Sequence, residues 1–205
     1  MNTAQRELSD QIDDATQRLL STARLLAEPD LRAPSLLPGW TRGHVLTHLA
    51  RNADAMRNLL AGVRTGTDRP AYASAAARAA DIEAGAGRPP APLLADLADS
   101  AMALRTIARQ LPDEAWPAEV RMLDSGPFPA AQLLTRRLVE VELHHADLGA
   151  GYGPADWPAA FDALELAEPM RAQRRDRLAR PPAAAGRPPE PRRPGPPPAG
   201  GRPLI

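Results

Sequence analysis

Two short segments of the chain carry all of its histidines. His44 and His48 lie in PGWTRGHVLTHLARNADAMRN, and His144 and His145 lie in RRLVEVELHHADLGAGY. In the second segment Glu140 precedes His144 by four residues, which places the two side chains on one face of a helix. Two imidazoles and a carboxylate, from His48, Glu140 and His144, form a ligand set that leaves one coordination position open, as in catalytic zinc sites. The spacing therefore favours a metal site shared by two facing helices.

Spacing alone leaves a second interpretation open, in which each histidine is a surface residue or a capped core residue. The metal interpretation gains support from Asp147, which follows His144 by three residues and could accept a hydrogen bond from its ring N–H. Glu142 and His145 point to other faces of the same helix, at about 100° per residue. We expect these two side chains to face solvent or to line the flank of the site.

The histidine segments belong to a series of amphipathic helices. Apolar residues recur every three or four positions in four long segments, which predicts helices at residues 3–27, 41–61, 93–111 and 130–148. A shorter helix is expected at residues 159–168. The connection over residues 65–92 has only a weak helical pattern, at 72–83, and is too long for a simple up-and-down order. The sequence therefore predicts an all-α four-helix bundle with a long crossover between helices 2 and 3.

Composition limits the classes of protein to which the chain can belong. Cysteine is absent, which excludes disulfides and thiolate metal sites and makes an intracellular setting the default. The N-terminus is acidic, and no run of about 18 apolar residues occurs, so neither a signal peptide nor a membrane span is expected. We expect a cytoplasmic monomer or homodimer that acts on small molecules, with no nucleic acid and no membrane as partner.

Charge and complexity change near residue 168. Residues 1–168 contain 16 Arg and 23 acidic residues, whereas residues 169–205 contain 9 Arg and 2 acidic residues. Ten of the 24 prolines fall in residues 181–205, where large apolar side chains are almost absent. Such a segment cannot offset its ordering entropy. We therefore expect a helical domain at 1–168 and a low-complexity, disordered tail at 169–205. The tail could be a basic nucleic-acid or polyproline ligand, or the product of a GC-rich gene read out of frame.

The stretches PGWTRGHVLTHLARNADA and EVELHHADLGAGYGPADWP resemble the mycothiol-dependent maleylpyruvate isomerase family. The N-terminal domain of that family is a DinB-like metal-binding bundle, and the resemblance covers about residues 5–165. It implies that His48, Glu140 and His144 hold the metal. It also implies that His44 is a neighbour of the ligands rather than one of them.

The resemblance further implies a cofactor and a reaction. A divalent metal, zinc, would bind the thiol of mycothiol and lower its pKa, because the thiolate is the nucleophile. Thiolate addition to the cis double bond of maleylpyruvate, rotation and elimination would give fumarylpyruvate. Asn52 is then a candidate cofactor contact. Arg51, Arg136 and Arg137 are candidates for contact with the substrate's carboxylates, and Trp40 is interpreted as a packing residue.

The chain departs from the family after Trp157. Family members continue there into a smaller C-terminal α/β domain, whereas this chain continues into the Pro/Arg-rich tail. We therefore expect the C-terminal domain to be lacking and turnover to be impaired. Two alternatives stay open: a mycothiol S-transferase that conjugates electrophiles at the same metal, and a metal-binding bundle without catalysis.

Overall fold

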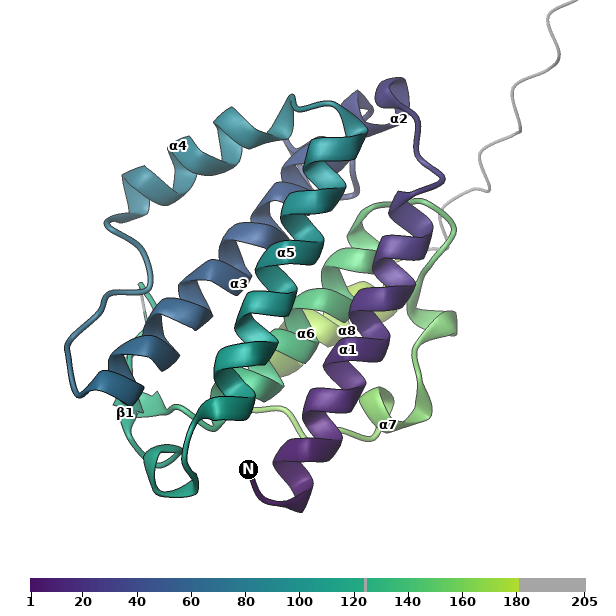
Figure 1. The fold of residues 1–205 in the computed structure, drawn as a ribbon. Coiled ribbons are helices and arrows are strands. Elements are labelled where there is room, and N and C mark those ends of the chain that lie inside the picture. Colours follow the sequence, from purple (N-terminus) through teal and green to yellow (C-terminus); the bar gives the residue numbers. More distant parts are fainter. Residues whose placement is uncertain (124, 181–205) are drawn as a thin grey trace, which may run out of the picture.

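The computed structural model describes residues 1–123 and 125–180, and within them the chain forms a helical bundle (Figure 1). Its four long helices are α1 (Thr3–Ala23), α3 (Arg42–Thr65), α5 (Pro90–Gln110) and α6 (Gln132–Asp147). The shorter elements are α2 (Glu28–Arg32), α4 (Ala75–Ala86), η1 (Asp113–Ala115), β1 (Glu119–Val120), β2 (Phe128–Pro129), η2 (Pro154–Asp156), α7 (Ala159–Asp162) and α8 (Met170–Leu178). The prediction of an all-α four-helix bundle with a long crossover is confirmed.

Local sequence signals set the ends of the long helices. The Asn2 side chain accepts a hydrogen bond from the Gln5 N–H, and the Asn2 N–H donates to the Gln5 side chain, both at 2.9 Å. This reciprocal pair is a capping box. Thr41 begins α3 in the same way, with His44 as its partner. Gly66 ends α3 at φ 64°, a left-handed conformation that glycine adopts without a Cβ clash.

The apolar faces of the long helices meet in two adjoining clusters. One cluster joins α1, α3 and α6 through fully buried residues such as Leu19, Leu46 and Leu138. The other lies toward the C-terminal end of α3 and includes Met56 and Leu133. Truncating one such leucine to alanine typically costs about 2–5 kcal/mol. The core therefore holds the backbones of α3 and α6 firmly against each other.

The crossover helix α4 lies against the first half of α3 (Figure 1). A Cβ atom on Gly43 would lie 2.2 Å from the carbonyl oxygen of Ala86, and one on Gly85 would lie 2.4 Å from Cγ2 of Thr47. Both distances are far below van der Waals contact, so the two helices can approach this closely only because glycine stands on each of them. The contact places α4 over the part of α3 that carries His48.

Helix α1 ends at Ala23, before the predicted end at residue 27, and the separate helix α2 follows. A proline at position 29 is unfavourable inside a continuing helix. Pro29 instead lies in the first turn of α2, where its missing N–H would have had no helical partner. Asp30 supports the start of α2, because its carboxylate accepts a hydrogen bond from the Ala27 N–H at 3.0 Å.

Two further differences concern short elements. The helix predicted at residues 159–168 ends at Asp162, and the following residues take an irregular path that buries Leu166. The antiparallel pair of β1 and β2 was not predicted. Strands of two residues are too short to show an alternating pattern of apolar and polar residues.

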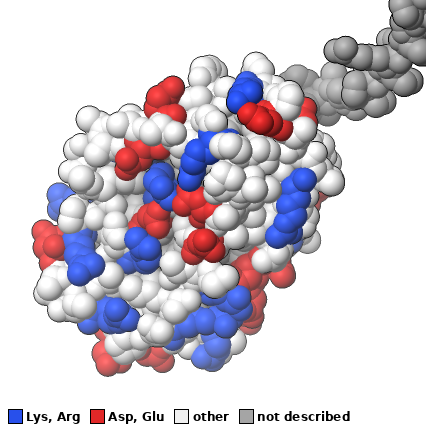
Figure 2. All heavy atoms as spheres, turned by 45° about the horizontal axis from the view of Figure 1, so that its top comes forward, with Lys and Arg blue, Asp and Glu red and all other residues white. Residues whose placement is uncertain are grey.

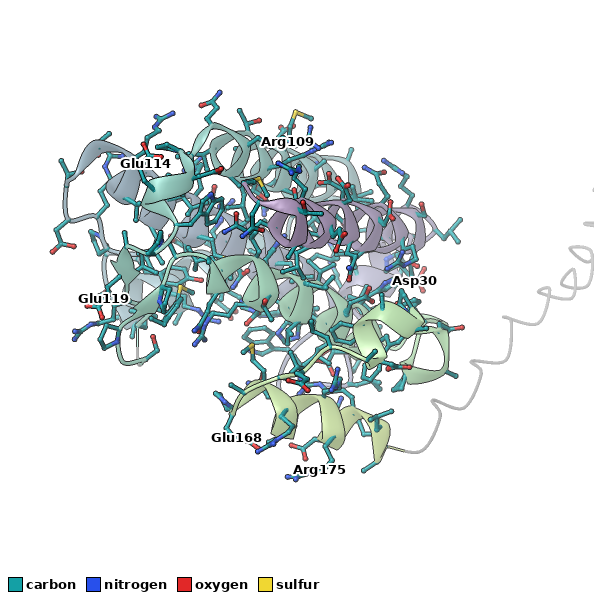
Figure 3. The ribbon with its side chains drawn as sticks, turned by 90° about the horizontal axis from the view of Figure 1, so that it is seen from below. Asp30, Arg109, Glu114, Glu119, Glu168 and Arg175 are labelled. Atoms are coloured by element: carbon teal, nitrogen blue, oxygen red, sulfur yellow. The ribbon has the colours of Figure 1, made fainter. Side chains whose placement is uncertain are left out.

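Helix α8 lies within the segment for which the sequence predicts a low-complexity tail. It packs against α6 with Met170 buried, and its Arg177, together with Arg180 just beyond it, forms ion pairs with Asp147 of α6. Figure 3 shows α8 along the outside of the bundle, with Arg175 pointing away from it. The boundary expected at residue 169 is therefore too early, because a buried carboxylate on α6 supplies partners that composition does not reveal.

The remainder of the predicted tail, residues 181–205, lies outside the described residues. Figure 2 shows acidic and basic side chains interspersed over one face of the bundle rather than gathered by sign. Among the helices of the described ranges, none combines the length and the apolar character that a membrane span requires.

Candidate metal centre

Helices α3 and α6 bring His48, Glu140 and His144 together. Nε2 of His48 lies 2.9 Å from Oε2 of Glu140, and Nε2 of His144 lies 3.4 Å from the same oxygen. One candidate ligand atom from each residue lies within 4.8 Å of the other two. Ligand atoms around a tetrahedral zinc ion are roughly 3.3 Å apart, given bonds of about 2.0–2.1 Å. Small side-chain movements would therefore let the three residues share one ion.

Asp147 holds the ring of His144. Its Oδ2 lies 2.9 Å from Nδ1 of His144, which leaves Nε2 directed toward Glu140. The Asp147 carboxylate is fully buried and also accepts hydrogen bonds from Arg177 at 2.8 Å and from Arg180 at 2.6 Å. A carboxylate on the far ring nitrogen fixes the tautomer and orientation of a metal-binding histidine. The geometry thus agrees with the acceptor role that the spacing suggested.

The three candidate ligands set one another's pKa values. Desolvation by itself would raise the pKa of Glu140, but hydrogen bonds from His144 and His48 hold that pKa well below its usual range. Desolvation likewise opposes protonation of His144, yet its carboxylate partners Asp147 and Glu140 raise its pKa to about 9. Burial lowers the pKa of His48. At neutral pH the metal-free centre therefore holds an ionised Glu140, a protonated His144 and a neutral His48.

The crossover helix adds Arg78 to the centre. Its Nη2 donates to Nδ1 of His48 at 3.0 Å, so the proton of this neutral ring is on Nε2, which donates to Glu140. The guanidinium carbon of Arg78 also lies 5.7 Å from the ring centroid of Tyr72. Neither residue was predicted to lie at the site, because the weak helical pattern at 72–83 does not indicate where their side chains point. Ser74, whose hydroxyl caps α4, was the available signal for the start of this helix.

The arginines considered as substrate contacts differ in their surroundings. Arg51 is held by this chain's own carboxylates, with Nη2 lying 2.6 Å from Asp96 and 2.9 Å from Asp54. Arg136 lies one helical turn before Glu140, and its guanidinium carbon is 4.0 Å from the centroid of a phenylalanine ring, that of Phe128. Of these two arginines, Arg136 is the one without an ion pair among the described residues.

Arg137 and Asn52 lie on the core side of the helices. They are 1% and 2% exposed, and Nη1 of Arg137 donates to the Asn52 side chain and to the Leu49 carbonyl, both at 2.9 Å. Burial lowers the pKa of Arg137 to about 10. Asn52 is enclosed by the core, and Arg137 lines a cavity that none of the three candidate ligands lines. The geometry therefore does not favour contact of Arg137 with a substrate at the candidate metal centre, or of Asn52 with a cofactor there.

The prediction that Glu142 and His145 face solvent or line the site was wrong. Each is 1% exposed, because α1 packs against this face of α6. Glu142 pairs with Arg18 of α1 at 2.6 Å and accepts a hydrogen bond from Tyr152 at 2.5 Å. His145 hydrogen-bonds to Thr22 of α1 at 2.8 Å and stacks on the ring of Tyr152. Both residues therefore belong to the interface between α1 and α6.

His44 and Trp40 border the centre without joining it. Nδ1 of His44 accepts the Thr41 N–H in the cap of α3, and its Nε2 lies 3.1 Å from Glu83. Trp40 packs against the core, with its ring centroid 5.5 Å from that of His48. These positions agree with the interpretation of His44 as a neighbour and of Trp40 as a packing residue.

The sequence matches the family model of the mycothiol maleylpyruvate isomerase N-terminal domain over residues 12–149. No curated protein matches it significantly. The crystal structure of the mycothiol-dependent maleylpyruvate isomerase is similar, with a TM-score of 0.73 and 31% sequence identity over 77% of this chain and 65% of that chain. A variant of an isomerase of this description, with one histidine replaced by alanine, has the same TM-score at 30% identity. These likenesses confirm the DinB-like character of the bundle.

Proposed function

The chain belongs to the family of mycothiol maleylpyruvate isomerase N-terminal domains, and from this premise we propose that it is a zinc-dependent, mycothiol-using isomerase of maleylpyruvate. The observation that carries the proposal is the convergence of His48, Glu140 and His144, whose candidate ligand atoms lie within 4.8 Å of one another. The chain spans 65% of the similar isomerase. Because this chain matches only part of that longer protein, we assign the isomerase activity to this chain as a proposal.

The donor set suits a divalent metal. Two imidazole nitrogens and one carboxylate oxygen are ligands that zinc takes when a further position stays open for a reactant. Glu140 is already ionised and His48 already neutral at neutral pH, so only the proton of His144 has to leave. When bound, zinc would supply the positive charge that lowers the pKa of a coordinated thiol.

The nucleophile has to come from outside the chain, because the sequence contains no cysteine. Mycothiol supplies a thiol for this role. When bound, mycothiol would supply the chemistry of reversible thiolate addition to the cis double bond of maleylpyruvate, which allows isomerisation and returns the thiolate unchanged. A cytoplasmic location, where thiols stay reduced, fits this use of a thiol cofactor.

Arg78 would change partner when the centre is loaded. A histidine that binds a metal through Nε2 carries its proton on Nδ1. Arg78 has only donors and cannot hydrogen-bond to a protonated Nδ1. Its guanidinium would be released beside the centre, and we propose that it and Arg136, which lies close enough to Glu140 to interact electrostatically with it, bind the carboxylates of maleylpyruvate.

A mycothiol S-transferase is the second candidate, because the same metal and thiol would conjugate an electrophile without isomerising it. A metal-binding bundle without catalysis is the third. The zinc-loaded chain, given mycothiol and then either maleylpyruvate or chlorodinitrobenzene, distinguishes the three. Formation of fumarylpyruvate supports the isomerase, conjugation alone supports the transferase, and inactivity toward both supports the non-catalytic bundle.

The variants His144→Ala and His44→Gln complete this experiment. His144→Ala removes a ligand and should abolish turnover, whereas His44→Gln keeps the capping box of α3 and should retain it. Turnover that survives His144→Ala would contradict a reaction at this centre.

A further inference from the structure

A cavity of about 230 Å³ opens between α1 and α5, with residues of α6 and the end of α3 completing its lining. Its walls are largely apolar and include Ile12, Leu20, Leu104 and Leu133. None of the three proposed metal ligands lines it. Pockets for drug-sized ligands have roughly 300–1,000 Å³, so this cavity suits a smaller molecule.

Arg137 brings a buried positive charge to this cavity. Its side chain lines the cavity and is 1% exposed. Nη1 has two acceptors, but Nη2 is buried without a hydrogen-bond partner. Among the described residues no carboxylate oxygen lies within 4.0 Å of its guanidinium. A buried charge without a paired anion is costly, so this guanidinium is suited to receive an anion from outside the chain.

Thr16 provides a second unpartnered polar group at the same cavity. It lines the cavity from α1 and is 6% exposed, and its hydroxyl has no hydrogen-bond partner among the described residues. A guanidinium and a hydroxyl among apolar walls can together bind a carboxylate whose remaining atoms are apolar.

The charged residues of the cavity restrict the charge of a ligand. Asp13 and Asp14 of α1 and Arg105 of α5 are among its lining residues, and Arg105 pairs with Asp13 at 2.8 Å. Arg109, which Figure 3 shows beside α1, reaches the same carboxylate at 3.8 Å. Because Arg105 and Arg109 already pair with Asp13, Arg137 is left as the one lining arginine without an ion pair among the described residues. One such cation suits a ligand with a single negative charge.

We propose that the cavity between α1 and α5 is a binding site for a small apolar monocarboxylate, with its carboxylate on Arg137 and Thr16 and its apolar body among the leucines. The site is separate from the proposed metal centre and independent of its reaction.

Binding of benzoate and hexanoate to the full chain tests the proposal, with benzamide and hexanamide as neutral isosteres. Calorimetry and thermal unfolding are measured after chelation of metals and again with zinc. At ten times Kd either acid should raise Tm by about 3–6 °C, with or without zinc. The amides should bind at least about tenfold more weakly, since they lack the charge that pairs with arginine.

Substitutions in α5, α1 and α6 locate the site. Ala101→Phe fills the cavity from α5 without altering Arg137 and should abolish the ligand-induced shift, whereas Ala95→Phe, exposed on the same helix, should keep it. Thr16→Val should weaken binding several-fold, and Arg137→Met should remove it. If Arg137→Met does not fold, the Ala101→Phe and Ala95→Phe pair decides.

Four outcomes would overturn the proposal: no saturable binding of either acid, equal binding of acids and amides, binding that survives Ala101→Phe, or binding lost with the metal or in His48→Ala. The first three outcomes would leave the proposed metal centre untouched, because that proposal is tested separately by the zinc content of the chain.

Discussion

A single carboxylate oxygen organises the candidate metal centre at the scale of residues. Oε2 of Glu140 lies 2.9 Å from His48 and 3.4 Å from His144, so both imidazoles contact the same atom. The two rings nevertheless differ in charge, because His144 has Asp147 on its other nitrogen while His48 has Arg78. A carboxylate favours the protonated ring and a guanidinium disfavours it.

This difference predicts how zinc binding depends on pH. Because the pKa of His144 is raised to about 9, its proton competes with zinc at every pH below that value. Zinc affinity should rise about tenfold per pH unit between about pH 7 and 9, with about one proton released per ion, and then level off. Unperturbed histidines would compete only below about pH 6.5. Calorimetry in buffers of different ionisation enthalpy measures the proton count, and an affinity unchanged between pH 7 and 9 would contradict the assigned charge of His144.

His145 predicts a separate effect of pH on stability. Burial, assisted by Arg18, lowers its pKa to about 4, compared with 6.5 for an ordinary histidine. The unfolded chain therefore takes up this proton as pH falls below about 6.5, while the folded chain resists until about pH 4. This difference in the pKa of His145 should lower the free energy of unfolding by about 2 kcal/mol between pH 7 and pH 5. Urea titrations at both pH values test this, with His145→Gln expected to show a smaller loss. An equal loss in the variant would assign the effect to other groups.

The convergence of the candidate ligands could be predicted from the sequence because Glu140 and His144 lie one helical turn apart, and this spacing is a local property. The burial of Glu142 and His145 could not be predicted, because it depends on packing against α1. The residues of α1 that contact them lie more than 120 positions earlier in the sequence. Arg78 was missed for a similar reason. Its contact with His48 depends on the close approach of α3 and α4 at Gly43 and Gly85.

Helix α8 supports the centre at the scale of elements. Asp147 is fully buried, and it holds His144 while it accepts hydrogen bonds from Arg177 and Arg180. Without these cations the buried carboxylate would have fewer partners to offset its desolvation. Helix α8 is therefore coupled to the candidate metal centre through this one carboxylate.

This coupling predicts that Arg177→Gln destabilises the fold by about 1–3 kcal/mol, as expected for the loss of a hydrogen bond to a buried charge. Arg175→Gln is the matched control, because that side chain is exposed and points away from the bundle in Figure 3. It should change stability by no more than about 0.5 kcal/mol. Urea unfolding of both variants measures the difference. Similar values for the two would mean that the ion pair with Asp147 contributes little.

The long helices were predictable because their apolar periodicity and caps are encoded within a few residues, as at Thr41 and Gly66. Elements that are stabilised by residues far away in the sequence were not predictable in this way. Helix α8 has few apolar residues, and its ion pairs connect it to a residue about 30 positions earlier. The β1–β2 pair consists of strands too short for any periodicity.

At the scale of the whole molecule, the bundle joins two segments that are 92 residues apart at His48 and Glu140. Residues 181–205 lie outside the described residues, and their sequence offers almost no large apolar side chain to bury. We therefore predict that deleting them changes Tm by less than about 2 °C, because little apolar surface would be lost. Thermal unfolding of the truncated chain measures this. A larger fall in Tm would show that the tail packs on the bundle.

The zinc content of the purified chain tests the central claim most directly. After zinc loading and dialysis at pH 8, elemental analysis should find about one ion per wild-type chain and per His44→Gln chain, because His44 is a neighbour of the ligands and not one of them. His48→Ala and His144→Ala, folded by circular dichroism, should retain almost none. A folded wild-type chain without zinc, or either alanine variant with as much zinc as the wild type, would contradict a metal centre at His48, Glu140 and His144.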